Sequence, residues 1–355
     1  MCSIDVPKPD RNGRIGLEHH DPSRAWPGYT LLWSGGTRRA RIIDMDGQPL
    51  HSWELDHGPT WHWCDLMDDG HLLVVANEYA YGTSRNIEAR LWELDWEGNV
   101  VWSDPAPVHH DARRLANGNT LIACNGPTVF KDLSNTPQIY DYIQDITPEN
   151  EIVWEWHFGA HADQLPTASN DNELPPGHEE WPHINTVESL PDTPLGERDE
   201  RFKPGNILVS PRHMHLIFII DRDTGDIVWH WGQGEILGQH QPTMLEDGNI
   251  LMFDNGHGPP ERGQSRVIEI KPDTGKIVWE WPDDPEREFW SPVGSGAQRL
   301  PNGNTLICAM NWGDTGRIFE VTPDGDIVWD YWNSEEKRCY RATRLSRDVV
   351  EDLLN

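Results

Sequence analysis

The chain has 355 residues, of which 59 are acidic and 29 are basic, and its formal net charge is −30 at pH 7. A surface of this sign repels nucleic acids and anionic membranes, so neither is expected as a partner. The N-terminal segment MCSIDVPKPDRNGR lacks the apolar core of a secretory signal, and no apolar run could cross a bilayer, which predicts a cytoplasmic protein unless an export signal has been removed.

One pattern recurs six times along the chain. Each copy has a turn glycine (Gly28, Gly70, Gly118, Gly205, Gly248 and Gly303). An apolar run follows each glycine, reading YTLLW, HLLVV, NTLIA, NILVS, NILMF and NTLIC. Such short runs of aliphatic and β-branched residues are typical of buried strands.

Two more strands are expected after each apolar run, for example RVIEIKP and then IVWEWP. Four short strands in units of about 40–50 residues are typical of a β-propeller. The sequence therefore predicts an all-β fold, a single six-bladed propeller domain over residues 1–355 with a short C-terminal helical tail. The predicted blades cover approximately 14–55, 58–104, 108–158, 182–232, 239–282 and 289–333, and the tail covers 334–355.

The fourth strand of every copy carries tryptophan, as a pair in Trp154/Trp156, Trp229/Trp231 and Trp279/Trp281 and otherwise singly. The members of a pair are two residues apart, so they lie on one face of the strand. Aromatic packing between neighbouring blades explains a residue that every blade repeats better than ligand stacking does.

The first strands of propeller blades line the central channel, so residues at one repeat position form a ring around the axis. Counting back eight residues from each glycine, with allowance for an insert in the fourth copy, selects His20, His62, His110, Asn185, His240 and Ser295. His183 lies on the same face as Asn185. Four histidines at one repeat position exceed what packing needs, which favours a functional role.

The second strands add another polar layer. Seven residues after the glycine lie Asn77, Asn125, Arg212 and Asn255, and His213 follows Arg212. The planar guanidinium of Arg212 suits sulfate or carboxylate, although an ion pair with an acidic side chain is an equal alternative. Neutral histidine acts as a base, a nucleophile or a metal ligand, and the sequence does not distinguish these roles.

Several motifs resemble the arylsulfotransferase family, and the resemblance covers most of the chain. The most specific are HHD, SPRH and QH…FDNG, which contain His110, His213 and His240, and the terminal RCYRATRL also resembles the family. The resemblance implies an enzyme that moves a sulfuryl group from an aryl sulfate to a phenol through a sulfohistidine.

By motif, the resemblance implies that His240 is the nucleophile and that His110 and His213 stabilise the transferring group and the phenolate. Arg212 is the candidate anion partner, and His183, Asn185, Asn125 and Asn255 are candidates for binding a small aromatic substrate. This reaction needs no cofactor.

Two other functions remain open at this stage. His20, His62, His110 and His240 project toward one axis and could form a cage for a divalent transition metal, which would support oxygenase or lyase chemistry. A non-catalytic propeller that only binds a ligand is the third alternative, because fold does not determine function.

Overall fold

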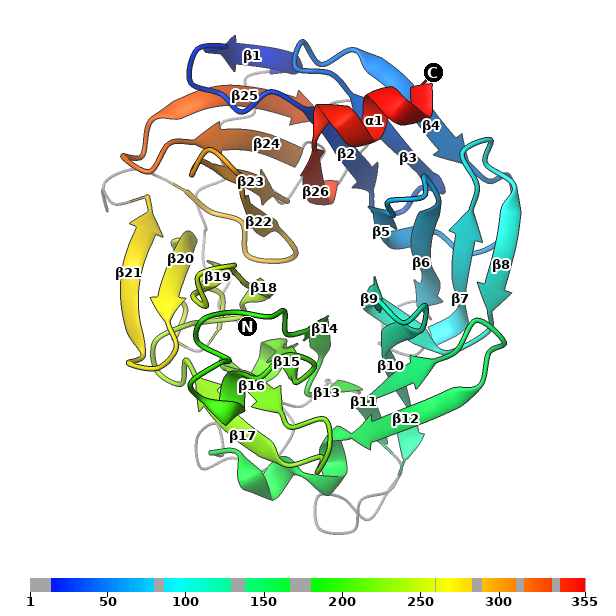
Figure 1. Ribbon diagram of the computed structural model, residues 1–355, viewed down its shortest axis with the longest axis vertical. Helices are drawn as coiled ribbons and strands as arrows, with labels where there is room; N and C mark the ends of the chain where they lie inside the picture. Colours follow the sequence, from blue (N-terminus) through cyan, green and yellow to red (C-terminus); the bar gives the residue numbers. More distant parts are fainter. Residues whose placement is uncertain are drawn as a thin grey trace, which may run out of the picture.

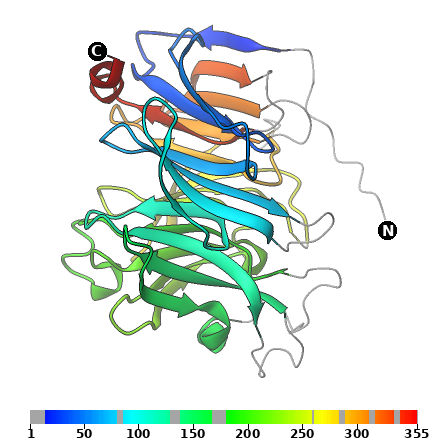
Figure 2. The same ribbon diagram turned by 90° about the vertical axis from the view of Figure 1, so that its right-hand side faces the viewer.

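The structure is a computed structural model that describes residues 14–79, 86–128, 138–166, 180–258, 260–282, 289–310, 316–333 and 339–354. Its strands form six sheets around a central axis, which confirms the predicted six-bladed β-propeller (Figure 1). Viewed from the side, the sheets form one thick ring, and the C-terminal helix α1 (Arg347–Leu354) lies on one face of it (Figure 2). Among the described residues, no helix has the length and apolar character needed to cross a membrane.

The strands of each blade run from the channel outward. The first blade contains β26 (Cys339–Leu345), β2 (Tyr29–Ser34), β3 (Arg39–Ile43) and β4 (Pro49–Glu54); the second contains β5 (Trp61–Leu66), β6 (Leu72–Tyr79), β7 (Asn86–Leu94) and β8 (Val100–Asp104); the third contains β9 (Val108–Arg114), β10 (Thr120–Thr128), β11 (Gln138–Ile146) and β12 (Ile152–His157). The fourth contains β14 (Ile184–Ser189), β15 (Ile207–Pro211), β16 (Ile217–Ile220) and β17 (Ile227–Trp231); the fifth contains β18 (His240–Met244), β19 (Ile250–Asp254), β20 (Arg266–Lys271) and β21 (Lys276–Trp281); the sixth contains β22 (Gly296–Arg299), β23 (Thr305–Ala309), β24 (Gly316–Val321) and β25 (Ile327–Asn333).

A few short elements complete the chain. The strand β13 (Glu180–Trp181) pairs with β11 of the third blade. Short 3₁₀ helices lie at η1 (Phe158–Ala160), η2 (Ala162–Gln164), η3 (Glu200–Phe202) and η4 (Arg212–Met214).

The two ends of the chain close the ring, and here the predicted boundaries of the first blade and the tail are wrong. The segment predicted to be the inner strand of the first blade is β1 (Gly16–His20), which pairs with β25 at the outer edge of the sixth blade. The inner strand of the first blade is instead β26, which lies within the predicted tail and pairs with β2. Pairing a C-terminal strand with an N-terminal one satisfies backbone groups that an open blade would leave exposed.

The turn glycines explain why the repeat is so regular. Gly70, Gly118, Gly205, Gly248 and Gly303 all have φ between 85° and 88°. Glycine adopts this left-handed conformation without the steric cost that a Cβ atom imposes. Each of these glycines therefore fixes where the inner strand of its blade ends and the second strand begins.

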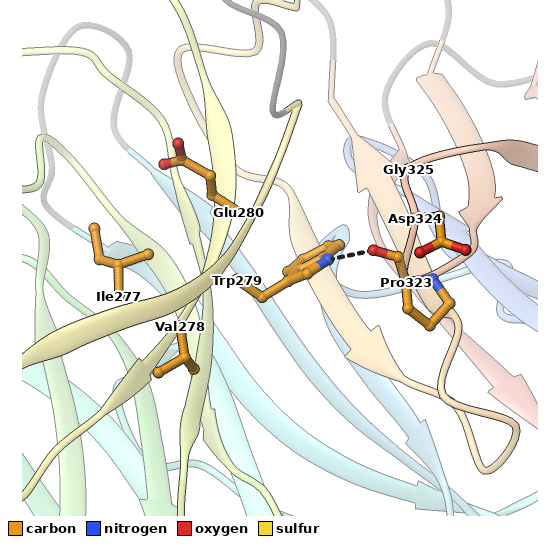
Figure 3. A pocket seen from close by; sticks show the side chains of 7 residues that line it. All are labelled: Ile277, Val278, Trp279, Glu280, Pro323, Asp324 and Gly325. Carbon is orange, nitrogen blue, oxygen red and sulfur yellow. Dashed lines mark hydrogen bonds between the residues drawn. The ribbon is translucent and has the colours of Figure 1, made fainter.

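Tryptophans of the outermost strands connect every blade to the next one, as the sequence pattern predicted. Apart from that of Trp332 on β25, each indole N–H donates to a backbone carbonyl in the turn between the third and fourth strands of the following blade. Figure 3 shows one example, in which the indole of Trp279 points at the carbonyl oxygen of Pro323, 3.0 Å away. In the described part of the chain, the donors and carbonyls are Trp53–Asp95, Trp102–Pro148, Trp154–Arg222, Trp156–Gly225, Trp229–Pro272, Trp231–Gly275, Trp279–Pro323, Trp281–Gly325 and Trp329–Met45.

Several junctions add an arginine and a glutamate to the tryptophan. At the closing junction, Arg344 of β26 lies over the ring of Trp329, 4.7 Å from its centroid, and its Nη1 lies 3.1 Å from an oxygen of Glu320. Arg299 occupies the same repeat position and pairs with Glu269 over Trp279. The Arg344–Glu320 pair is fully buried, whereas the other pair is partly exposed.

We expect Glu320→Gln to lower the free energy of unfolding by about 3 kcal/mol, because it leaves the buried guanidinium of Arg344 without its counter-charge. The matched variant Glu269→Gln removes the same charge at the partly exposed junction and should cost about 1 kcal/mol or less. Urea denaturation monitored by tryptophan fluorescence measures both values. Equal losses for the two variants would contradict the importance of burial at the closing junction.

Candidate active site in the central channel

The inner strands place one residue from each blade at the same height in the channel. In every blade, the residue two positions after the turn glycine pairs with an inner-strand residue, and the ring residue lies four positions before that partner. This register selects His62, His110, Asn185, His240, Ser295 and Tyr340. We call this set the channel ring.

The channel ring corrects one member of the predicted set. His20 lies on β1 at the outer edge of the sixth blade, where its Nδ1 is 3.9 Å from Asp46, and it does not reach the channel. Tyr340 of β26 occupies the corresponding position instead. The count along the sequence selected His20 because it assumed that the strand before Gly28 lines the channel.

Irregular backbone accompanies the channel ring. The ladders between first and second strands shift register beside ring residues in β5, β9, β14, β18 and β26. His110, His183, Gln241 and Ser295 have φ values of 59°, 67°, 49° and 78°. Bulges of this kind redirect side chains, and left-handed non-glycine residues cost about 1–3 kcal/mol each. Bulges and left-handed residues thus recur at or next to the ring position in several blades, which indicates that they direct side chains into the channel.

The aromatic rings form a continuous arc around the channel. Ring centroids are 4.8 Å apart for His213 and His183, 4.5 Å for His183 and His110, and 4.4 Å for His110 and His62. Tyr340 then lies 4.8 Å from His62 and 6.2 Å from His240. The structure therefore brings together all of the predicted channel histidines except His20.

Burial keeps three histidines of the arc, His62, His110 and His240, neutral. It lowers the pKa of His62 to about 3 and the pKa values of His110 and His240 well below the ordinary range, with additional repulsion from neighbouring imidazoles and arginines. Neutral imidazole carries one nitrogen lone pair that can attack an electrophile or accept a proton.

Hydrogen bonds determine which nitrogen of His240 carries that lone pair. Its Nδ1 lies 2.7 Å from Oδ1 of Asn255 and 3.0 Å from the carbonyl oxygen of Gly238. The amide of Asn255 cannot be reversed, because its Nδ2 donates to the carbonyls of Ser291 and Gly294. Both partners of Nδ1 are acceptors, so Nδ1 is protonated and Nε2 holds the lone pair.

Other asparagines also support channel residues. The side chain of Asn77 hydrogen-bonds His62, which repeats the His240–Asn255 pairing in the second blade. Asn125 is buried at the equivalent position of the third blade. Asn185 donates to the carbonyl oxygen of Gln239, the residue before His240.

Arg212 lies beside the His240 site on the turn η4. One of its Nη atoms lies 2.9 Å from Nδ1 of His257 and 3.5 Å from the carbonyl oxygen of Pro292. No carboxylate among the described residues lies within ion-pair distance of it, so the sequence alternative of a carboxylate partner is not found there. Burial lowers the pKa of Arg212, and its charge lowers the pKa of His240. A half-buried cation without a carboxylate partner favours an anionic ligand.

Comparison with known proteins identifies the family of the chain. A family model described as Arylsulfotransferase (ASST) matches residues 66–334. The chain belongs to the arylsulfotransferase family. Among solved structures, it resembles a protein of unknown function from Bacteroides caccae with a TM-score of 0.60 at 14% identity, covering 90% of this chain and 99% of that one. A streptogramin B lyase structure is similar with a TM-score of 0.50 at 14% identity, covering 92% of this chain and 84% of that one.

At identities this low, the similarity to these structures shows only a shared fold. A search of curated proteins finds no match.

Among the described residues, the channel histidines do not form a group of three ligand atoms that all lie within 4.8 Å of one another. Within the described part of the chain, the group of His, Cys, Asp and Glu side chains whose ligand atoms all lie within 4.8 Å of one another is Asp69, His71 and Glu93. These residues lie on the second blade outside the channel ring, and Glu93 also pairs with Arg114. The predicted cage lacks His20, which lies at the outer edge of the sixth blade.

Sequence reasoning missed the residues that β26 contributes. Arg341 is buried and reaches across the channel, where it bonds Asp111, the carbonyl oxygen of Asn185 and the hydroxyl of Thr186. The Tyr340 hydroxyl is also buried, and no described residue hydrogen-bonds it with ordinary geometry. The segment RCYRATRL was noticed only as a family resemblance, although its apolar and polar residues also fit a strand.

We expect His62→Gln to make stability less sensitive to acid. In the unfolded chain His62 binds a proton below about pH 6.5, whereas in the folded protein it does so only near pH 3. As the pH falls between these values, the free energy of unfolding therefore decreases by up to ~1.4 kcal/mol per pH unit. Urea denaturation between pH 7 and pH 5 should therefore show a smaller loss in the variant than in the wild type.

The raised pKa values of Asp65 and Glu188, about 6 and about 7, affect both proteins and cancel in that comparison. His71→Gln is the matched control, because Glu93 raises the pKa of His71. The stabilising contribution of His71 is present at low pH and is lost as the pH rises. The His71→Gln variant should therefore be less stable than the wild type mainly at acidic pH. The prediction would be contradicted if the free energy of unfolding depended on pH in the same way for His62→Gln and the wild type.

Proposed function

We propose that the protein transfers a sulfuryl group from an aryl sulfate to a phenolic acceptor, with His240 as the nucleophile. The fixed tautomer of His240 is the observation that carries this proposal. Its Nε2 lone pair attacks sulfur, a nitrogen–sulfur bond forms, and the bond from sulfur to the aryl oxygen breaks. The acceptor phenol then attacks the sulfohistidine and restores the imidazole. The reaction requires no cofactor.

Arg212 has a matching role in this proposal. Sulfuryl transfer moves an anionic group, and its transition state places negative charge on the sulfuryl oxygens and the leaving phenolate. A guanidinium beside His240 with no carboxylate partner among the described residues can bind those oxygens. His110, His213 and His183 lie along the arc. In this proposal they would contact the substrate on the side away from Arg212.

The candidate substrate-binding asparagines act differently in this proposal. Asn255 uses its amide to orient His240, and Asn185 uses its amide to hold Gln239. We therefore assign both a positioning role. Asn125 is kept as a candidate for substrate binding at the wall of the third blade.

We expect His240→Ala to abolish sulfuryl transfer from 4-nitrophenyl sulfate to a phenol, while the melting temperature changes little. Mass spectrometry of the wild type mixed with donor alone should find one added sulfuryl group on the peptide containing His240. His71→Ala removes a histidine outside the channel and should retain full activity.

Normal turnover by His240→Ala would refute the nucleophile. Elemental analysis provides a second check: about one transition metal per chain, lost in His62→Ala, would contradict a cofactor-free mechanism.

We expect Arg212→Gln to raise KM for the aryl sulfate by roughly ten- to a hundredfold, because a charge-assisted hydrogen bond to a buried anion contributes about 1.5–3 kcal/mol. Arg212→Lys should show an intermediate loss, since lysine keeps the charge but not the planar fork. Arg201→Gln removes an exposed arginine that pairs with Asp199 and serves as the control. Steady-state kinetics at fixed ionic strength measures all three, and an unchanged KM in Arg212→Gln would exclude Arg212 from anion binding.

A further inference from the structure

A second histidine and a carboxylate lie behind His110, away from the channel. Nδ1 of His109 lies 2.6 Å from Nδ1 of His110, and Nε2 of His109 lies 3.3 Å from Oδ1 of Asp141 on β11. His109 and Asp141 are both fully buried. The other carboxylate oxygen of Asp141 accepts the backbone N–H of Ile184 at 2.5 Å. The three side chains therefore form a line from the interior of the third blade to the channel.

This line determines the tautomer of His110. The contact does not have the angles of a hydrogen bond, but the negative charge of a carboxylate oxygen 3.3 Å from Nε2 of His109 favours a proton on that nitrogen. In neutral His109 the lone pair is then on Nδ1, which accepts a hydrogen bond from Nδ1–H of His110. The lone pair of His110 consequently lies on Nε2, the nitrogen that does not face His109.

The repeat shows that packing does not require this arrangement. The residue before the ring position is Trp61, Ile184, Gln239, Gly294 or Cys339 in the other blades, and only the third blade has a histidine there. Asp141 pairs with Asn125 across the ladder, whereas Ala89 pairs with the equivalent Asn77 in the second blade. Both departures from the repeat occur in the third blade, where Asp141 lies beside His109 and His109 contacts His110.

The two ring histidines His110 and His240 are therefore supported by different chemistry. Neutral oxygens of Asn255 and Gly238 hold His240, and they cannot compensate a positive charge as a carboxylate can. His110 is supported by an imidazole with a carboxylate behind it, so a proton on His110 is stabilised by the negative charge of Asp141. The first arrangement suits a nucleophile, and the second suits an acid–base group.

We propose that Asp141 and His109 are positioning residues of a buried relay that makes His110 the general base and acid of the reaction. This inference rests on the proposed function. In the second half-reaction, the proton of the acceptor phenol moves to Nε2 of His110 while its oxygen bonds sulfur and the nitrogen–sulfur bond to His240 breaks. The proton then passes to the leaving phenolate oxygen of the next donor, so His110 is unchanged over a full cycle.

Other groups around His110 also influence this proton. Burial lowers the pKa of His110, and so do His62, His183 and His240 from neighbouring inner strands and His109 beside it. Tyr340 lies 6.3 Å from it between ring centroids. In the proposed relay, the negative charge of Asp141 is what favours the charged form, and it acts through the proton that His109 holds on Nε2.

The tautomer can be measured without any assay of activity. In protein with ¹⁵N-labelled histidine at pH 7, the wild type should show His110 protonated on Nδ1 and unprotonated on Nε2. Asp141→Asn keeps the shape and removes the charge, and it should give a mixture of tautomers. Asp145→Asn is the matched control, because Asp145 is equally buried on the same strand but pairs with Arg222. A wild-type His110 that is protonated on Nε2 would overturn the relay, whatever reaction the protein catalyses.

Kinetics then test the proton transfer. In Asp141→Asn and His109→Gln, kcat with a weakly acidic phenol as acceptor should fall roughly a hundredfold. Formation of sulfohistidine from 4-nitrophenyl sulfate should change less than about threefold, since that leaving group needs no proton. The rate should also depend more steeply on the acidity of the acceptor, and a merely structural loss would not produce this dependence.

Equal losses in both half-reactions, or an unchanged dependence on acceptor acidity, would overturn the relay as a catalytic device. Absence of any transfer by the wild type would instead refute the proposed function and the proton-transfer step with it. The measured tautomer would separate that outcome from a failure of the relay itself.

Discussion

The indole N–H groups of the outer strands link every blade to the next, and the geometry of the channel depends on those links. An indole that donates to a turn carbonyl fixes the distance and the angle between two blades at once. Six such junctions must agree for the ring to close, and the last of them joins Trp329 to Met45 near the two ends of the chain. Because the channel histidines come from different blades, their mutual distances follow from these outer contacts.

Closure also explains why the polar centre of the channel includes the end of the chain. Strand β26 brings Tyr340 into the arc between His62 and His240, and it brings Arg341 to the carboxylate of Asp111 on the third blade. Arg344 of the same strand holds the closing junction through Glu320. One strand thus connects the stability of the ring with the composition of the site, so an unfolded C-terminus would remove both.

The features that recur in every blade could be predicted from the sequence, whereas the departures from the repeat could not. The turn glycines and apolar runs identified the second, third and fourth strands of every blade, and their register correctly placed His62, His110 and His240 in the channel. His20 was misplaced because pairing between the two ends of a chain leaves no local pattern. The contact of His109 with Asp141 depends on which way two side chains turn across a blade, which periodicity does not determine.

The overall charge and the proposed substrate have the same sign, so long-range attraction cannot explain how an aryl sulfate would bind. A net charge of −30 repels anions at a distance, but at physiological salt this repulsion is screened beyond about 8 Å. Inside the channel the nearest full charges matter more, and there Arg212 has no carboxylate partner among the described residues. Neutral histidines around it add hydrogen-bonding groups without adding negative charge. Selectivity for a sulfate ester would then come from desolvated contacts at short range, so binding should become easier as added salt screens the acidic surface.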